Sequence, residues 1–320
     1  MRFWARTSPW RQTALFGCLG LALLAADRSA MAQSAGFNPA DYGRAQLPTR
    51  QSTGDAGHYI DANKGAFEPI SELDPGDPLA ALAKPIGRVD IVLRNRKTGE
   101  EIGTSCTGEL LAGDYVLTNH HCLPAEGDLA PVKASILMDY VLLDGKGSQR
   151  FELDPKPVEA SATLDYAIAK ASGNPTAQFG SVQIAPAPAA SGRSLLVIHH
   201  PMGRPKVMSR FRCMALKEED GELRHRCDTL GGSSGSLLFD GRSFGVALHK
   251  EGGLAPNDPS SFNTATSMAA LLAQSPILKA IAATEVAAPP AEQPVTAAPQ
   301  PQDAISVPDT ATMNQILRGP

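Results

Sequence analysis

The chain has 320 residues and a formal net charge of −4; 42% of its residues are hydrophobic and 19% are charged. This balance fits one or two globular domains with a substantial core, and the mild acidity argues against a nucleic-acid-binding protein, which would carry a clustered basic face. Only 5% of residues are aromatic, whereas there are 29 glycines and 26 prolines, which favours a loop-rich β protein over a helical bundle.

The N-terminus has the pattern of an export signal. Three arginines precede an apolar run over residues 13–26, which is too short to span a bilayer, and small residues follow at Ala30 and Ala32. We therefore predict a signal peptide over residues 1–32, cleaved before Gln33, and a protein exported to the periplasm or beyond. The alternative, a membrane anchor, would keep this segment; after cleavage we expect no stable membrane association.

Removal of the signal peptide leaves four cysteines, Cys106, Cys122, Cys213 and Cys227. Four cysteines allow three pairings. The two short-range pairings, Cys106–Cys122 and Cys213–Cys227, each close a loop of about 15 residues and are worth about 3 kcal/mol in the chain-entropy model. A zinc site is the alternative, but no C-x-x-C or H-x-x-x-H spacing occurs, and an oxidising compartment favours disulfides. We predict two disulfides and neither a metal nor an organic cofactor.

The chain after the signal peptide divides into three parts. Residues 33–84 are polar without a sustained period, which fits a pro-segment, an irregular arm or a disordered leader. Residues 85–283 hold short apolar segments between turn signals, and residues 284–320 are rich in Ala and Pro, which predicts a disordered tail.

Short strands at close spacing predict an all-β barrel or sandwich. The expected strands are Val89–Leu93, Ile102–Leu111, Tyr115–Thr118, Ala134–Met138, Val141–Leu143, Leu164–Ala169, Leu195–Ile198, Leu237–Phe239 and Ser243–Leu248. One helix is expected over Met268–Ile281, with a break at Pro276 because proline cannot continue a helix from its interior.

The Gly/Ser-rich stretch from Cys227 to Leu238 is the first candidate for chemistry. Its glycines exclude a helix interior but suit a tight turn that presents a hydroxyl and two main-chain N–H groups at one point. A nucleophilic serine with an oxyanion hole needs this arrangement. A merely flexible turn is the alternative.

A nucleophilic serine also needs a base and a group that orients the base. His121 follows an apolar strand and precedes a cysteine that can tether it, whereas its neighbour His120 faces the other way in an extended segment and is expected to be structural. Asp165 lies among apolar residues, where a buried carboxylate needs a partner such as an imidazole N–H. The alternative is an edge-strand aspartate facing water.

The order of these residues separates two hydrolase architectures. Ser233 also fits the G-x-S-x-G pattern of esterases, but that pattern needs a helix after the serine and a later acid and histidine. The segment that follows is β-rich, and His249 is the only later histidine. The order His121, Asp165, Ser234 is the one found in the chymotrypsin architecture.

Three segments, Thr118–Cys122, Leu164–Ile168 and Thr229–Ser236, together resemble the trypsin-like serine proteases, and most of all the bacterial branch that includes the glutamyl endopeptidases. The resemblance covers roughly residues 85–283. It implies two packed six-stranded antiparallel β-barrels, a C-terminal helix, and a site between the barrels. It also implies His121 as general base, Asp165 as its orienter and Ser234 as nucleophile, with the N–H groups of Ser234 and Gly232 forming the oxyanion hole.

Two further features bear on activation and specificity. Ser233 stands where animal trypsins have the aspartate that binds the freed N-terminal amine, so that mode of activation is not expected. Thr229 and His249 match positions that line the primary pocket of glutamyl endopeptidases, and a hydroxyl and an imidazole can together solvate a carboxylate. No aspartate is expected at the pocket base. His199 and His225 are interpreted as structural.

The sequence thus predicts an exported serine endopeptidase that acts on proteins or peptides through an acyl-enzyme, with a possible preference for Glu or Asp before the scissile bond. The alternatives are a silent binding module with a protease fold and a small-ester or amide hydrolase that uses the same triad. The oligomeric state cannot be predicted.

Overall fold

The structure is a computed structural model that describes residues 35–48, 66–184, 191–255 and 258–287. The predicted signal peptide and nearly all of the predicted C-terminal tail lie outside these residues. The described residues up to Glu285 belong to one compact unit, and Val286 and Ala287 belong to a second. The elements below belong to the first unit, apart from the last two residues of the final helix.

The first barrel holds the strands between Ile86 and Lys170. They are β3 (Ile86–Asn95), β4 (Glu101–Leu111), β5 (Tyr115–Thr118), β6 (Leu129–Met138), β7 (Gln149–Glu152), β8 (Glu159–Ser161) and β9 (Tyr166–Lys170). Their order in the sheet is β7-β6-β3-β4-β5-β9-β8, and every pairing among them is antiparallel. A bridge between Leu153 and Ala171 returns the end of β7 to the end of β9, so six of the strands close into a ring.

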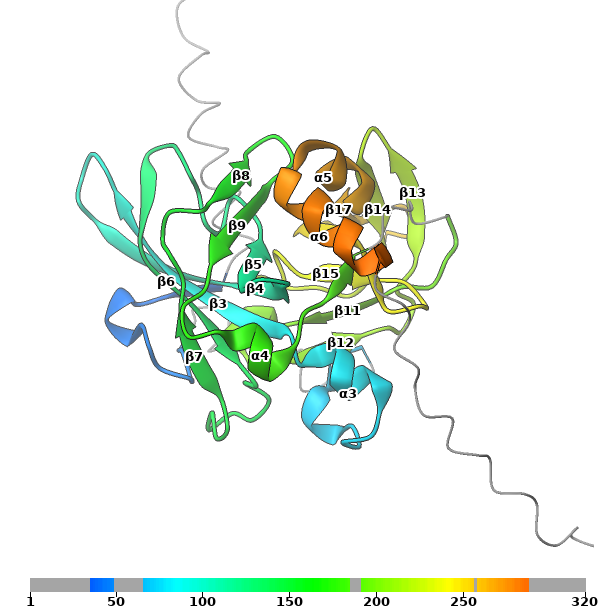
Figure 1. Cartoon of the computed structure of the whole chain (residues 1–320), viewed down its shortest axis with the longest axis horizontal. Helices are drawn as coiled ribbons and strands as arrows, with labels where there is room; N and C mark the ends of the chain where they lie inside the picture. The colour runs from blue at the N-terminus through cyan, green and yellow to red at the C-terminus, as the bar shows by residue number, and fades with distance from the viewer. Residues whose placement is uncertain (1–34, 49–65, 185–190, 256–257, 288–320) are drawn as a thin grey trace, which may run out of the picture. The chain divides into compact units, whose positions relative to one another are not determined.

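The second barrel has the same construction. Its ring contains β11 (Leu196–His199), β13 (Ala215–Glu219), β14 (Glu222–His225), β15 (Leu237–Phe239), β16 (Phe244–Glu251) and β17 (Asn263–Ser267), and it is extended by β2 (Glu68–Pro69), β10 (Gln183–Ile184) and β12 (Val207–Ser209). A bridge between Ser194 and Met214 joins the strand ends and closes the ring. The predicted pair of antiparallel barrels is confirmed, and Figure 1 shows them side by side.

A shared apolar core joins the two barrels. Leu111, Leu117 and Ile168 from the first barrel pack in one cluster with Leu237 and Leu248 from the second. The helices α5 (Met268–Gln274) and α6 (Pro276–Ala287) add their apolar residues to the same cluster. The predicted break at Pro276 is confirmed, because this proline is the first residue of α6, where its missing N–H costs nothing. The helix continues to Ala287, four residues past the predicted end of the folded part.

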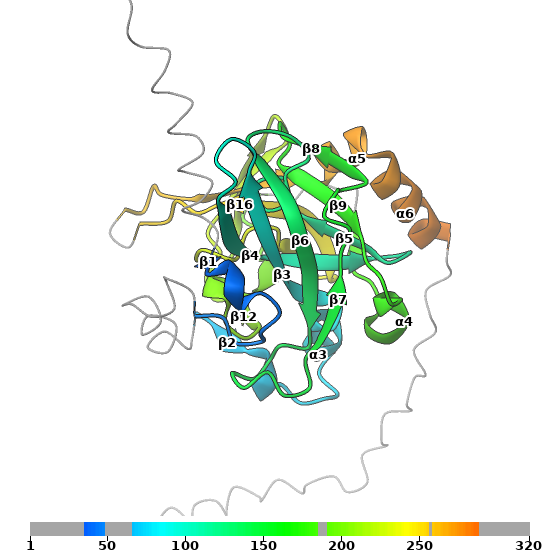
Figure 2. The ribbon, with the colours of Figure 1, turned by 90° about the vertical axis from the view of Figure 1, so that its left-hand side faces the viewer.

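Residues 35–48, which we call the N-terminal arm, lie along the first barrel. Its strand β1 (Ala35–Phe37) pairs antiparallel with Gly103–Ser105 of β4, and the short helix η1 (Pro39–Asp41) follows. Figure 2 shows the arm in blue beside β3 and β4. Residues 66–84 supply β2, the short helix η2 (Ile70–Glu72), and the helix α3 (Pro78–Ala83), which begins with an Asp77 side chain capping the N–H of Leu79.

The predictions of a strand at residues 141–143 and of one beginning at Leu164 are wrong. Leu142 and Leu143 are exposed and lie in a turn, and β9 begins only at Tyr166.

The two predicted disulfides, Cys106–Cys122 and Cys213–Cys227, are present. The remaining short helices, α4 (Pro175–Phe179) and η3 (Pro201–Gly203), both pack near β4. Within the described part of the chain, no helix is long and apolar enough to cross a membrane.

Candidate active site

His121 and Asp165 meet at the end of the first barrel. The Nδ1 atom of His121 lies 2.8 Å from Oδ2 of Asp165, and the main-chain N–H of His121 donates to Oδ1 over 2.9 Å. Because a carboxylate can only accept, Nδ1 carries the imidazole proton and Nε2 keeps its lone pair. That Nε2 atom is buried and has no hydrogen-bond partner. Asp165 therefore binds His121 at two points, one on the ring and one on the main chain, and the basic nitrogen of the ring stays uncommitted.

A left-handed turn places Asp165 for this contact. Asp165 has φ of 50° and immediately precedes β9, so it is a turn residue and not the strand residue that the sequence predicted. Aspartate tolerates this conformation better than most side chains because its short carboxylate can interact locally. The side-chain amide of Asn119 donates to the main-chain carbonyl of Asp165 over 2.7 Å and holds the turn. The neighbouring His120 accepts from the N–H of Ala125, as expected for a structural histidine.

The loop Leu230–Gly235, which carries the predicted nucleophile and is called the nucleophile loop below, packs directly against the strands that lead to His121. The N–H of Thr107 donates to the carbonyl of Ser234 over 2.9 Å. A Cβ built on Gly235, which has φ of +86°, would lie 2.3 Å from the carbonyl oxygen of Thr107 and 3.2 Å from the nitrogen of Asn119. Only glycine fits this approach, and it brings the serine of the second barrel to the histidine segment of the first. Ser234 itself is 1% exposed.

Gly232, the second predicted oxyanion-hole residue, has φ of +94°. Its Cβ, if present, would lie 2.8 Å from the carbonyl oxygen of His200 and 3.0 Å from the nitrogen of Met202. Its carbonyl accepts from the Thr107 hydroxyl over 2.9 Å. Gly232 and Gly235 of the loop both have positive φ, as glycines in a tight turn can, and both allow a close approach of the backbone.

Comparison with known proteins agrees with this geometry. Residues 106–248, which include all the residues just described, match the family model of the trypsin-like peptidase domain. The chain carries a trypsin-like peptidase domain. None of the curated proteins matches the sequence.

Among solved structures, a Glu endopeptidase in complex with MPD is similar to 63% of this chain over 91% of its own length, at 19% identity and a TM-score of 0.48. The Rv3671c protease in its inactive form is similar over 67% of this chain and 95% of its own, at 18% identity and a TM-score of 0.42. An inactive serine-to-alanine mutant of Rv3671c from M. tuberculosis gives 20% identity, 66% and 95% coverage, and a TM-score of 0.42.

Ser233 of the peptidase domain takes part in a buried hydrogen-bond chain. Its hydroxyl accepts from the N–H of Leu230 over 3.1 Å and lies 2.8 Å from Nδ1 of His199, whose Nε2 lies 3.2 Å from the hydroxyl of Ser209. Burial lowers the pKa of His199 to about 3, so the ring is neutral. The Ser233 hydroxyl proton needs an acceptor, and Nδ1 of the neutral His199 ring supplies it. The ring proton is then on Nε2, which donates to the Ser209 hydroxyl. Ser233 is thereby anchored, which disfavours the esterase alternative.

His249 and His225 form a second buried pair. The N–H of Cys227 donates to Nδ1 of His225, whose Nε2 lies 3.1 Å from Nδ1 of His249. Burial holds the pKa of His225 well below its usual value and lowers that of His249 to about 3, the nearby His121 adding to the effect on His249. Both rings are then neutral, so His225 donates to His249, and His249 keeps its Nε2–H as a donor. The sequence reading missed this role of His225, because nothing in its neighbours along the chain indicates that it meets His249.

Thr229, the other predicted pocket residue, is oriented by Asn263. The Nδ2 group of Asn263 donates to the Thr229 hydroxyl over 2.9 Å and to the carbonyl of Cys227 over 2.8 Å. Its Oδ1 accepts from the N–H groups of Gly253 and Leu254, so the amide cannot turn over. Since the Thr229 oxygen accepts, its proton is available to donate. No sequence pattern pointed to Asn263.

An acidic residue adjoins this pair. Asp228 directly precedes Thr229 and is half-buried, and burial raises its pKa while the charge of Arg212 acts in the opposite direction. Because Asp228 is next to Thr229 in the chain, it is included in the test of specificity below. The one group in the described part of the chain with metal-ligand proximity, Cys106, His121 and Cys122, has both its sulfurs in a disulfide and therefore offers no thiolate.

Proposed function

We propose that this chain is an exported serine endopeptidase that uses Ser234 as nucleophile, His121 as general base and Asp165 to orient the base. The observation that carries the proposal is the double contact of Asp165 with His121, made through the ring and the main chain, in a peptidase domain whose serine loop abuts the same segment. The two disulfides are compatible with export.

The mechanism follows from the orientation of the His121 ring, whose Nδ1 faces Asp165. Its Nε2 lone pair takes the proton of the Ser234 hydroxyl as the oxygen attacks the substrate carbonyl, and Asp165 stabilises the imidazolium that forms. The N–H groups of Gly232 and Ser234 would bind the oxyanion of the tetrahedral intermediate. Collapse passes the proton to the leaving amine and leaves an acyl-enzyme, which a water molecule hydrolyses by the same steps. The catalytic hydrogen bond from serine to histidine commonly tightens only when substrate is bound.

We further propose that Thr229 and His249 bind the side chain before the scissile bond. A hydroxyl proton held by Asn263 and an imidazole N–H held by His225 are two preorganised donors, which suit an acceptor such as a Glu or Asp carboxylate. Because His249 is neutral, the pocket would bind this carboxylate by hydrogen bonds, with Asp228 opposing it.

Labelling with a fluorophosphonate, followed by mapping of the modified peptide, tests the triad. Ser234 should be labelled in the wild type, and the Ser234→Ala variant should neither be labelled nor cleave casein. Ser233→Ala separates the two serines, because label that this variant retains cannot lie on the neighbouring hydroxyl. Label on Ser233 would favour the esterase alternative, and the absence of label would favour a silent binding module. Comparing turnover of a peptide with turnover of its ester separates an endopeptidase from a small-ester hydrolase.

Peptides that differ only in Glu, Gln or Lys before the scissile bond test the pocket. We expect Glu to exceed Gln in kcat/KM, Thr229→Val to remove most of that preference, and Asp228→Asn to increase it. A chain that prefers Lys, and loses this preference in Asp228→Asn, would show that Asp228 controls the pocket.

A further inference from the structure

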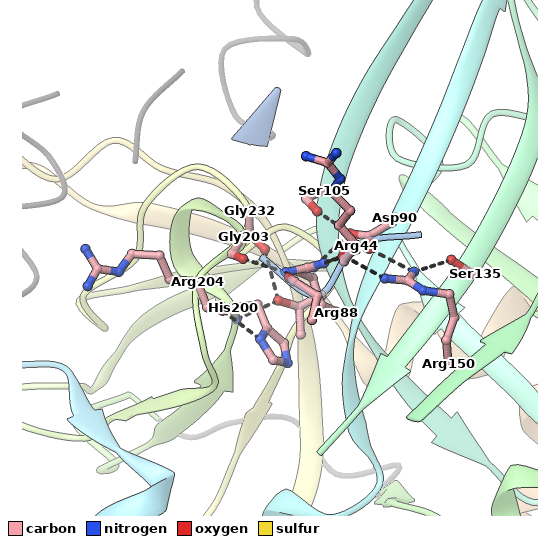
Figure 3. A network of polar contacts seen from close by, with 12 residues as sticks. Arg44, Arg88, Asp90, Ser105, Ser135, Arg150, His200, Gly203, Arg204 and Gly232 are labelled. Carbon is pink, nitrogen blue, oxygen red and sulfur yellow. Dashed lines mark hydrogen bonds and ion pairs between the residues drawn. The ribbon is translucent and has the colours of Figure 1, made fainter. Parts of the chain in front are cut away.

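Arg88 is completely buried, yet all five of its guanidinium N–H groups have acceptors. On β3 it faces away from the core of the first barrel, with 0% of its surface exposed. It donates to both carboxylate oxygens of Asp90, over 2.8 and 2.9 Å, and to the carbonyl of Gly203 over 2.8 Å. The remaining two N–H groups donate to carbonyls of the N-terminal arm, Ala45 at 2.6 Å and Arg44 at 3.0 Å. Figure 3 shows this network.

The arm carbonyls are needed because the cluster carries an excess positive charge. Asp90 is also fully buried and accepts from Arg88, from Arg150 over 2.9 Å, and from the hydroxyl of Ser105. Burial alone would raise the pKa of Asp90, but the two guanidinium groups hold it below its usual value. Two cations and one anion leave one charge uncompensated, and Arg150 joins Arg88 in donating to the carbonyl of Arg44. Main-chain dipoles of the arm thus solvate a charge that burial would otherwise penalise.

The same Arg88 reaches the nucleophile loop through one turn. The N–H of Gly203 donates to the carbonyl of His200 over 3.1 Å and closes the turn His200–Gly203. Met202 of this turn donates its N–H to the carbonyl of Gly231, and the Gly232 Cα sits against the turn so closely that no Cβ would fit. Arg88 therefore holds, by its bond to Gly203, the surface on which the predicted oxyanion hole rests.

Thr107 supplies a second link between the same parts. Its hydroxyl accepts from the N–H of His200 over 3.0 Å and donates to the carbonyl of Gly232 over 2.9 Å. Thr107 belongs to β4, the strand that pairs with β1 of the arm on one side and with β3 of Arg88 on the other. Arm, Arg88, turn and nucleophile loop form one connected network.

We propose that the N-terminal arm is part of the working enzyme: residues 35–48 complete the shell of Arg88, and Arg88 positions the turn that supports the oxyanion hole. The arm is then a positioning element retained in the active form, not a segment that must be removed. In animal trypsins a buried N-terminal amine pairs with an aspartate at the position of Ser233. Ser233 carries no charge, so the arm takes the place of that amine here. This inference rests on the proposed function, since it assigns a support to the same nucleophile.

Two glycines of the β1–β4 pairing, Gly103 opposite Phe37 and Gly36 opposite Thr104, allow the arm to be displaced selectively. A Cβ on Gly103 would lie 2.6 Å from the ring of Phe37 and 2.7 Å from its carbonyl oxygen, so Gly103→Ala must push the arm off the barrel. A Cβ on Gly36 would meet nothing nearer than 3.9 Å, so Gly36→Ala is the matched control. Hydrogen exchange of residues 35–47 in the full chain reports whether the arm has left.

The measurement is the second-order rate constant for fluorophosphonate labelling of Ser234, with kcat and KM for a peptide and the unfolding midpoint of each variant. Loss of one oxyanion-hole donor costs on the order of 100-fold in kcat. We expect Gly103→Ala to slow labelling and lower kcat by about 10-fold or more with KM changed less than about 2-fold, and Gly36→Ala to match the wild type. A displaced arm with labelling at the wild-type rate would overturn the inference.

Arg88→Lys provides the second test, and it decides the matter if Gly103→Ala fails to fold or leaves the arm in place. Lysine keeps a positive charge facing Asp90 but offers three donors at one point, which cannot also reach the arm and Gly203. We expect the same fall in kcat with little change in KM; labelling at the wild-type rate would refute the positioning role. A wild-type chain that takes no label would instead contradict the proposed function itself.

Discussion

Ser233→Ala tests the buried hydrogen-bond chain that anchors the residue next to Ser234, the proposed nucleophile. The variant removes one hydroxyl and leaves two groups without a partner, Nδ1 of His199 at 2.8 Å and the N–H of Leu230 at 3.1 Å. His199 is completely buried, so water cannot replace the lost bond, whereas Leu230 is partly exposed and can recover some of it. An unsatisfied buried polar group costs about 1–3 kcal/mol. We therefore expect the free energy of unfolding to fall by about 2–4 kcal/mol.

Urea unfolding followed by far-UV circular dichroism measures this loss. Fluorescence is unsuitable because both tryptophans, Trp4 and Trp10, precede the predicted cleavage site. The measurement belongs in a Ser234→Ala background, where self-cleavage cannot interfere.

Ser209→Ala is the comparison variant, since it removes only the other partner of His199. It should cost about 1–2 kcal/mol, and the double variant should depart from additivity because both hydroxyls bind one ring. A loss below about 0.5 kcal/mol in Ser233→Ala, or strict additivity, would refute the anchoring argument.

Three further outcomes are expected. Asp165→Asn should lower kcat by about 10⁴-fold, because an amide cannot hold the His121 ring in the tautomer that leaves Nε2 basic; a variant with near wild-type kcat/KM would exclude this role. Gly235→Ala should lower the free energy of unfolding by about 2 kcal/mol or more, because its Cβ would lie 2.3 Å from two oxygens at a positive φ; calorimetry would show an unchanged melting temperature if the loop were loosely packed. Lowering the pH below about 6.5 should already reduce the free energy of unfolding. His199 and His249 have a folded pKa of about 3 against about 6.5 when unfolded. Between these two pKa values the unfolded chain binds protons that the native state does not. Each histidine therefore lowers the free energy of unfolding by about 1.4 kcal/mol for every unit that the pH decreases. A free energy of unfolding that stays constant from pH 6.5 to pH 4 would contradict the burial of these histidines.

Local patterns along the chain were enough to predict the class of fold and much of its layout. Short apolar segments between turn residues predicted a β protein, the resemblance added two antiparallel barrels, and cysteine spacing predicted both disulfides correctly. The break at Pro276 followed from proline chemistry alone. These features depend on near neighbours in the sequence, so a single chain carries the information.

Where local signals were weak, the predictions went astray. Val141–Leu143 is apolar enough for a strand, but none of the described strands pairs with it, and its leucines lie exposed in a turn. Asp165 was predicted to lie in a strand, yet a left-handed turn aims its carboxylate at His121. The backbone conformation of a single residue depends on its tertiary contacts. The identity of that residue and of its neighbours in the sequence does not specify those contacts.

The supporting contacts of the site were decided by tertiary structure only. His225 meets His249 from a strand 24 positions earlier, Asn263 orients Thr229 across 34 positions, and Arg88 joins the arm to a turn 115 residues away. The sequence by itself determined which residues are chemically able to act and roughly how the strands are spaced. The tertiary structure decided which of these residues are in contact. The two barrels pack on a shared core, and a buried polar group can bind only the partners that this packing brings within reach.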